Sequence, residues 1–152
     1  MVVSTSNKSE TALGYATLYG DMAGGFAILK DVLKTSVYAL ARHRNTLSPV
    51  IPERVITRPP SAELAPNQTD QDHLPQYDVI DPIITHFMEH NLSAEEIIKQ
   101  GFNKKDVLLI IDKITRNEYK RRQAAPGVKI TARIFGRDWR YPITSGFHSH
   151  QK

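Results

Sequence analysis

Near the start of the chain, a run of polar side chains combines hydroxyls, an amide, a cation and a carboxylate. Asn7 followed three residues later by Glu10 has the spacing of a capping box, which begins a helix. A helix start exposes unpaired backbone N–H groups and a partial positive charge, so it suits an anionic ligand. From spacing alone we favour a plain cap with a solvated Lys8, and an anion site is the alternative. The run is Thr5-Ser6-Asn7-Lys8-Ser9-Glu10.

Histidine and tryptophan side chains give weaker signals. His86 and His90 are spaced one helical turn apart, but no carboxylate motif accompanies them, so we predict surface or partly buried residues. His148 and His150 could hold a metal ion, but a third ligand is missing and a solvated pair is favoured. Trp139 stands among arginines and could stack on a nucleic-acid base. The preferred interpretation is that its side chain packs the C-terminal tail, residues 128–152, against the rest of the chain.

The elements that must position these residues are mostly helices. Apolar residues spaced from Ala12 to Tyr19 predict that the helix begun at Asn7 continues until Gly20 interrupts it. Residues 26–29 are predicted as a short buried strand. A second helix should then run to about Asn45.

The chain changes character between Thr46 and Gln76, where prolines forbid a long helix and discourage a central strand. A loop of this length in a compact domain is usually functional or disordered. Helical structure is predicted to resume at Asp81, as an N-cap followed by Pro82 at the first helical position. The prolines of the loop are Pro49, Pro52, Pro59, Pro60, Pro66 and Pro75.

Two more capped helices should follow. Ser93 opens a short helix that stops at Gly101, and Asn103 opens a longer one that ends before Pro126. Residues 128–152 are predicted to be extended and loosely structured. With many helices and scarce strands, the chain looks like a helix-rich piece of an α/β domain whose sheet lies elsewhere; a helical bundle is the alternative.

Composition limits the classes of protein and site. The chain has 152 residues, enough for one domain, and a net charge of +4 that suits anionic ligands. It has no cysteine, which excludes disulfides, thiolate metal sites and cysteine nucleophiles. The longest apolar run, residues 107–111, is too short for a membrane span, and no secretory signal is seen. We therefore expect a soluble, cytoplasmic protein without a membrane or nucleic-acid partner.

Several segments in order carry a resemblance to a known family. The segments are Asn7–Phe26, Leu29–Thr35, Ile51–Leu64, Gln68–Asp72 and Phe135–Thr144. Together they resemble the glutamine-dependent NAD synthetases. The resemblance implies a ligase reaction in which the carboxylate of deamido-NAD attacks the α-phosphate of ATP, and ammonia from glutamine then displaces AMP. It also implies the C-terminal, helix-rich part of a doubly wound, Rossmann-like ATP-pyrophosphatase domain.

The resemblance also implies roles for five side chains. Thr5, Lys34 and Ser61 match residues that contact ATP, with Lys34 at its phosphates. Glu10 matches an acidic residue that serves deamido-NAD and, in ammonia-dependent relatives, magnesium. Lys120 matches a residue that binds deamido-NAD. ATP and Mg²⁺ are therefore the implied cofactors, with deamido-NAD as the substrate.

The chain departs from the family pattern in ways that limit its activity. Leu18 replaces a lysine of the ammonia-dependent relatives, which places the chain in the glutamine-dependent branch, and Asp21 keeps an acidic position without an assigned role. The Ser-Gly-Gly-x-Asp-Ser phosphate loop and the glutaminase domain are absent. We therefore expect the chain to be inactive alone.

Three further expectations concern the organisation of the chain. All 152 residues should form the C-terminal portion of the ligase domain, with residues 46–77 as a mobile lid and 128–152 as an extended tail. The longer enzyme is expected to be a homo-oligomer that supplies the missing portions. A non-catalytic remnant that docks on a partner chain is the alternative.

Overall fold

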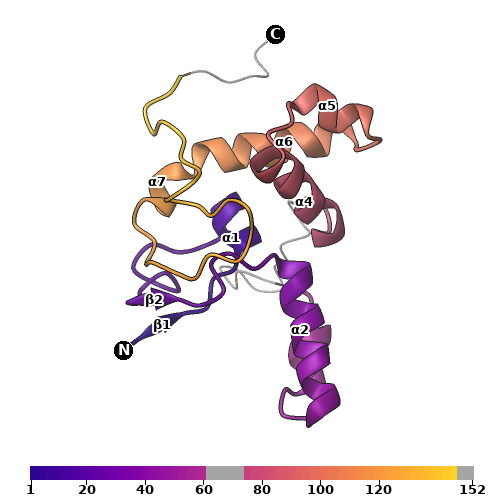
Figure 1. Ribbon diagram of the computed structural model, residues 1–152, viewed down its shortest axis with the longest axis vertical. Coiled ribbons are helices and arrows are strands. Elements are labelled where there is room, and N and C mark those ends of the chain that lie inside the picture. Colours follow the sequence, from indigo (N-terminus) through magenta and orange to yellow (C-terminus); the bar gives the residue numbers. More distant parts are fainter. Residues whose placement is uncertain (61–73, 147–152) are drawn as a thin grey trace.

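The computed structural model describes residues 1–60 and 74–146, which form a helix-rich arrangement with a small sheet at the N-terminus (Figure 1). Strand β1 (Val3–Ser4) pairs in parallel with β2 (Phe26–Ala27). Helix α1 (Lys8–Leu13) forms the crossover that two parallel strands require. The strand predicted at residues 26–29 is thus confirmed for its first two residues, and the mixed α/β composition is confirmed with it.

Helix α1 begins where it was predicted but ends early. Asn7 is its N-cap, and both hydrogen bonds of the capping box with Glu10 are present. Gly14 then adopts the left-handed conformation with φ of 72°, which a residue without a Cβ reaches at little cost. The predicted continuation to Tyr19 is wrong, and the Tyr19 side chain is 90% exposed.

Helices α2 (Lys34–Leu47) and α3 (Glu53–Thr57) form an arm that projects from the rest of the chain (Figure 1). The second predicted helix is confirmed as α2, although none of its residues is fully buried. The proline-rich stretch holds the five residues of α3, whose Ile56 is buried. No long helix occurs in the described part of this stretch, as its prolines predicted.

Helix α4 (Tyr77–Ile84) continues directly into a π-helical turn, η2 (Thr85–Glu89). The predicted start at Asp81 is wrong, because Pro82 lies inside α4. An interior proline costs about 3 kcal/mol, but each fully buried aliphatic side chain contributes about 1.5–3 kcal/mol. The buried residues of α4 are Tyr77, Ile80, Asp81, Ile83 and Ile84.

Helices α5 (Ala94–Lys99) and α6 (Lys104–Arg116) confirm both predicted caps. Ser93 makes the two bonds of a capping box, and the side chain of Asn103 accepts a hydrogen bond at the start of α6. The predicted single helix from Asn103 to Pro126 is wrong. It is interrupted before the short helix α7 (Glu118–Arg121).

Asn117 causes this interruption by connecting two helix ends. Its amide donates to the carbonyl of Leu13 at the end of α1 and to that of Lys113 in α6. The same side chain occupies the space that a Cβ on Gly14 would need. The end of α1 is therefore fixed against the end of α6.

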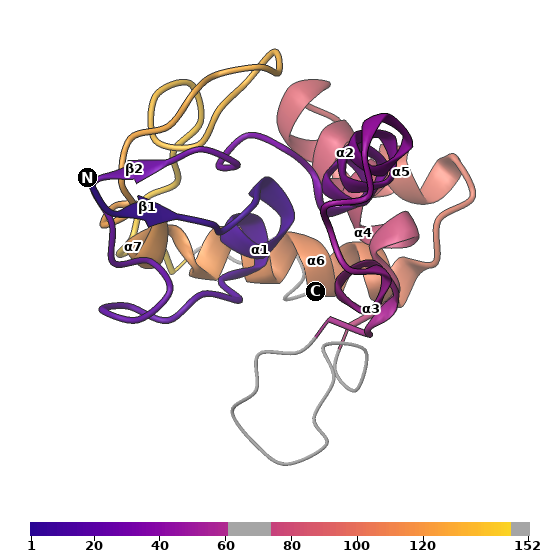
Figure 2. The same cartoon turned by 90° about the horizontal axis from the view of Figure 1, so that it is seen from below.

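The core lies where α6 crosses α1, α4 and α5 (Figure 2). Residues 128–146 contain no helix, as predicted, but they are not loose, because Ile134 and Phe135 are buried. None of the helices in the described ranges is long and apolar enough to cross a membrane. The core residues are Ala12, Leu13, Leu74, Tyr77, Ile80, Ile83, Ile84, Met88, Ile97, Val107, Ile110, Ile111, Ile114 and Phe135.

Candidate functional site

Two of the residues singled out from the sequence meet in the structure. The Nζ atom of Lys34 lies 2.6 Å from Oε1 of Glu10. Their side chains are 16% and 20% exposed, so solvent reaches the pair. The second carboxylate oxygen of Glu10 accepts the backbone N–H of Asn7 at 3.2 Å. One carboxylate therefore joins the start of α1 to the start of α2.

The start of α2 is held by side chains from two other helices. Ser9 Oγ accepts the N–H of Lys34 at 2.9 Å and donates to Oδ1 of Asp81 at 2.5 Å. Oδ2 of Asp81 accepts the N–H and the hydroxyl of Thr35. Because α2 has no side-chain cap of its own, Asp81 and Ser9 fix the turn from which Lys34 reaches Glu10.

The ionisation of Asp81 reflects its burial. The side chain is almost fully buried, at 2% exposure. Burial raises the pKa of Asp81 above its ordinary value of 3.8, although the hydrogen bonds from Ser9 and Thr35 act in the opposite direction. Sequence analysis treated Asp81 as the cap of its own helix, and the structure shows it as a cap for α2 instead.

Aromatic rings complete the surroundings of Lys34. The rings of Tyr38 and Tyr77 both have their centroids 5.7 Å from its Nζ atom. Such contacts stabilise an ammonium group that is partly removed from water. Lys34 is thus held by one carboxylate and two ring faces while it keeps contact with solvent.

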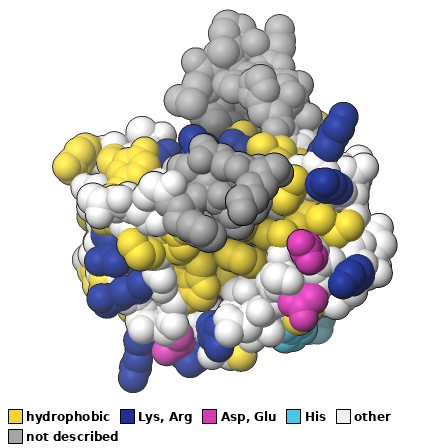
Figure 3. All heavy atoms as spheres, turned by 90° about the horizontal axis from the view of Figure 1, so that it is seen from above, with side chains coloured by type: hydrophobic (Ala, Val, Ile, Leu, Met, Phe, Trp, Pro, Cys, Tyr) yellow, Lys and Arg dark blue, Asp and Glu magenta, His cyan; other side chains and the backbone are white. Residues whose placement is uncertain are grey.

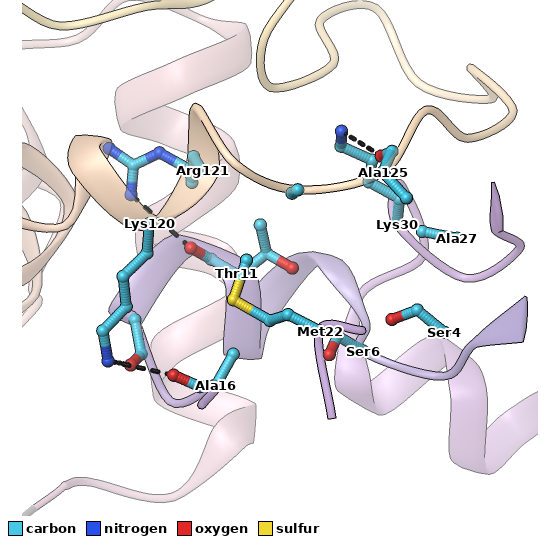
Figure 4. A pocket seen from close by; sticks show the side chains of 12 residues that line it. Ser4, Ser6, Thr11, Ala16, Met22, Ala27, Lys30, Lys120, Arg121 and Ala125 are labelled. Carbon is cyan, nitrogen blue, oxygen red and sulfur yellow. Dashed lines mark hydrogen bonds between the residues drawn. The ribbon is translucent and has the colours of Figure 1, made fainter. Parts of the chain in front are cut away.

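A small pocket with a cavity volume of about 20 Å³ lies on another side of α1 (Figure 4). Lys120 lines this pocket, and so do Lys30 and the hydroxyl of Thr11. Glu10 and Lys34 do not line it. The structure therefore divides the predicted residues between two places.

Lys120 is already engaged with the backbone. Its Nζ atom donates to the carbonyl oxygens of Gly14 at 2.6 Å and Ala16 at 3.0 Å (Figure 4). A cation at this position satisfies carbonyls that the end of α1 leaves unpaired. Lys120 thus closes the loop after α1 and forms part of the pocket wall.

Thr5 is exposed, whereas its two neighbours face the pocket. Ser4 Oγ donates to the carbonyl of Asp21 and Ser6 Oγ donates to its carboxylate, at 3.1 and 3.2 Å. That carboxylate also accepts the N–H of Thr17 at 2.5 Å. Asp21, which the sequence left without a role, therefore holds the loop beside the pocket.

A buried ion pair at Lys8 was missed by the sequence analysis. Its side chain is 0% exposed, so the predicted solvated lysine is wrong. Its Nζ atom lies 2.9 Å from Asp31 and 2.8 Å from Glu89, and donates to Thr131 and to the carbonyl of Arg133. Most of these partners are far away in the sequence, so local spacing contained no signal for the cluster.

Asp31 has more partners than Lys8 alone. Its carboxylate accepts the N–H groups of Ile130 and Thr131, and also the hydroxyl of Thr131. Burial alone would raise the pKa of Asp31, but these bonds and the one from Lys8 outweigh burial and lower the pKa. The carboxylate therefore stays charged and holds the tail against α1.

Arg121 in α7 is a second buried cation, and sequence analysis gave no signal for its burial. Its side chain is buried, pairs with Glu118 and donates to the carbonyl of Ala12. Burial lowers its pKa to about 10, although Glu118 acts in the opposite direction. The guanidinium lies 4.7 Å from the ring of Phe135 and 5.4 Å from that of Trp139, which confirms Trp139 as an anchor of the tail.

Three of the predicted residues are not placed. Ser61, His148 and His150 lie outside the described residues. Within residues 1–60 and 74–146, no group of three or more histidine, aspartate and glutamate side chains could hold a metal ion. Glu10 therefore belongs to no such group in the described part of the chain.

Comparisons with known proteins agree on one family. The sequence model for NAD synthase matches residues 1–124. The glutamine-dependent NAD(+) synthetase of Aquifex aeolicus is 62% identical over 147 residues, which are 97% of this chain and 26% of that protein. The enzyme of the same name from Acinetobacter baylyi is 60% identical over 149 residues, 97% of this chain and 28% of that protein.

A solved structure shows the same fold. The crystal structure of a glutamine-dependent NAD(+) synthetase from Cytophaga hutchinsonii superposes with a TM-score of 0.64 at 23% identity. The match covers 95% of this chain and 24% of that one. The chain therefore spans about a quarter of the length of the proteins it matches.

Proposed function

The chain belongs to the NAD synthase family, and we propose that it forms the C-terminal part of the ligase domain of a glutamine-dependent NAD synthetase. The complete enzyme would amidate deamido-NAD to NAD with ATP and glutamine-derived ammonia. The contact between Glu10 and Lys34 carries this proposal. The resemblance assigns one of these residues to deamido-NAD and the other to the ATP phosphates, and the fold brings them together across 24 positions.

The chemistry needs a positive charge beside phosphates. Lys34 supplies it from the first turn of α2, where the helix dipole adds a partial positive charge of its own. Its partner Glu10 keeps the ammonium in place until an anionic phosphate replaces the carboxylate. Such fixed charges stabilise phosphoryl transfer without reorganisation during the reaction.

Magnesium belongs to the proposal through the same carboxylate. Mg²⁺ is commonly bound by one or two carboxylates together with substrate phosphates and water. Glu10 fits this pattern as a single, partly exposed carboxylate next to the proposed phosphate position. Bound there, the ion would neutralise charge on the departing pyrophosphate.

The pocket is the proposed place for part of deamido-NAD. Lys120 and Lys30 lie in its wall, and an anionic group of the substrate would have to replace the backbone carbonyls that both ammonium groups contact. Burial lowers the pKa of Lys30, whose ammonium donates to the carbonyl of Ala125 at 2.7 Å. Thr5, which is exposed, is the proposed ATP contact.

The finer fold is also proposed. Parallel sheets are normally covered on both faces, yet the side chains of Val2, Val3 and Ile28 around β1 and β2 are 68%, 40% and 52% exposed. This supports a larger, doubly wound Rossmann-like sheet to which the rest of the enzyme contributes strands. A lid at residues 46–77 and an extended tail at 128–152 remain part of the proposal.

Exposed apolar side chains support contact with more polypeptide. The arm carries Leu40, Leu47, Val50 and Val55, each more than half exposed. Hydrophobic side chains also gather beside lysines and arginines on the face shown in Figure 3. Large exposed apolar patches mark interaction sites.

The missing portions of the enzyme are the proposed partners, and a non-catalytic docking module is the second candidate. A homo-oligomeric enzyme in the cytoplasm stays a prediction.

A chimaera tests the proposed function. The matching 147 residues of the Aquifex aeolicus enzyme would be replaced by those of this chain. We expect the chimaera to form NAD from deamido-NAD, ATP and ammonia, whereas this chain alone forms none. Lys34→Met and Glu10→Gln should each reduce the rate about 100-fold or more, as the loss of a transition-state contact does. Lys105→Met, an exposed lysine on α6, is the matched control.

Two results would contradict the proposal. One is a folded chimaera without synthetase activity, and the other is NAD formation by the chain alone. Titration of ATP and deamido-NAD into the chain, with and without Mg²⁺, separates the two candidate functions. A docking module would bind neither nucleotide.

A further inference from the structure

The rings of two histidines at the π-helical turn converge on a single point. His90 is exposed and His86 is half-buried, and their Nδ1 atoms are 3.3 Å apart. The ring centroids are 5.4 Å apart and the planes are inclined by 58°. Because the nitrogens are much closer than the centroids, the rings meet at their Nδ1 atoms and do not stack.

We propose that His86 and His90 form a binding site for a divalent transition-metal ion of the Zn²⁺ class, held through both Nδ1 atoms. Tetrahedral zinc with Zn–N distances of roughly 2.0–2.1 Å places two nitrogen ligands roughly 3.3–3.4 Å apart. The measured 3.3 Å has this value and is longer than the usual N–H hydrogen bond of about 2.9–3.0 Å. The proposal is independent of the NAD synthetase reaction.

The two histidines belong to the π-helical turn and its end. The N–H of His90 bonds to the carbonyl of Thr85, five residues earlier, at 3.2 Å. Side chains four positions apart lie on one face of such a turn, as they do in an α-helix. Single π-turns are often found at functional sites.

The surroundings hold this turn rigid. The ring of His86 packs edge-on against Phe102 at 5.7 Å. Glu89, between the two histidines, is fixed by Lys8 at 2.8 Å, and Arg133 donates to the carbonyl of Met88. A metal ion would therefore find its two ligands already ordered, which reduces the entropy lost on binding.

The ligand types select the metal. Imidazole nitrogens suit Zn²⁺, Cu²⁺ and Ni²⁺, whereas Mg²⁺ prefers oxygen ligands. In the described ranges no third histidine, aspartate or glutamate joins the pair. Water would complete the coordination shell, so the site is open and exchangeable. Its bound ion would lock the turn that carries Glu89 to the buried Lys8.

Calorimetric titration of the chain with Zn²⁺ tests the site, with Mg²⁺ as the comparison. We expect one Zn²⁺ per chain and no binding of Mg²⁺ at the same site. His90→Ala should weaken Zn²⁺ binding at least about tenfold without disturbing the core, since His90 is exposed. His86→Ala should have the same effect. His43→Ala, an exposed histidine on α2, should have none.

A double variant excludes the other histidine pair of the sequence. His148→Ala with His150→Ala should bind Zn²⁺ as the unchanged chain does. Loss of binding in this variant, with binding kept in His90→Ala, would overturn the proposal. Nitrogen-15 NMR of the histidine rings should show metal-induced shifts at Nδ1 of both residues, and shifts at Nε2 would contradict the geometry.

Discussion

Two lysine–carboxylate pairs on α1 have similar geometry but different surroundings. Lys8 lies 2.9 Å from Asp31 and Lys34 lies 2.6 Å from Glu10. The first pair is 0% exposed on both sides, whereas the second is 16% and 20% exposed. Charge and distance are alike in the two, so burial and the number of partners must decide what each pair does.

The buried pair has no capacity left for a ligand. Removing an ion from water costs several kcal/mol, and only good geometry with additional hydrogen bonds offsets this cost. Lys8 obtains these bonds from Glu89, Thr131 and the carbonyl of Arg133. Lys34 has one carboxylate partner and solvent access, so a phosphate could replace Glu10. The comparison indicates a structural role for the first pair and supports the proposed phosphate-binding role of the second.

The largest expected effect follows from breaking the buried pair. Asp31→Ala should lower the free energy of unfolding by about 3–5 kcal/mol, because it leaves the buried Lys8 ammonium without its fully buried carboxylate partner and removes the acceptor for Ile130 and Thr131. Urea denaturation measures this. The control Asp112→Ala removes an exposed pair with Arg116 and should cost less than about 0.5 kcal/mol. A loss below about 1 kcal/mol for Asp31→Ala would refute the structural role.

Acid should weaken the same pair. The pKa of Asp31 is lowered in the folded chain, so its contribution is present above the ordinary value of 3.8 and is lost as the pH falls through the folded pKa. Asp81 has a raised pKa, so its contribution is lost as the pH rises from 3.8 through that raised value. The urea concentration at the midpoint of unfolding should be measured between pH 3 and 7. As the pH falls, this midpoint should decrease less for Asp31→Asn than for the unchanged chain.

A smaller change at the buried pair should still be measurable. Thr131→Val removes the hydroxyl that contacts both Lys8 and Asp31 while it keeps the side-chain shape. We expect the free energy of unfolding to fall by about 1–3 kcal/mol, which is the usual cost when a buried charged group loses a hydrogen bond. Thr46→Val serves as the control, because its hydroxyl bonds locally at an exposed position. Equal effects of the two substitutions would contradict the comparison.

The contrast between the pairs shows what sequence reasoning can reach. The caps at Asn7 and Ser93 were predicted because a capping box joins residues only three positions apart. Asp81 followed by Pro82 has the pattern of a helix start as well, but burial of the apolar face of α4 determined the outcome. Local rules succeed where the partners are local.

Such local rules cannot predict contacts between residues that are far apart in the sequence. Lys8 meets Thr131 across 123 positions, and Arg121 meets Ala12 across 109. Lys8 was assigned to solvent because charged side chains usually lie there, and nothing in the sequence marked Arg121 as buried. Glu10 and Lys34 were each selected by resemblance, but their mutual contact required the fold.

The smallest expected effect on stability belongs to the partly exposed pair. Lys34→Met should change the free energy of unfolding by less than about 1 kcal/mol, because solvent screens the ion pair and methionine keeps a similar apolar chain although it loses the ammonium contacts with the two tyrosine rings. The same substitution should reduce the rate of NAD formation by the chimaera about 100-fold or more. Urea denaturation and the ATP dependence of NAD formation measure the two effects separately. If Lys34→Met instead destabilises the chain as much as Asp31→Ala does, the two pairs share one structural role. That result would refute the proposal that Lys34 is available to bind a phosphate.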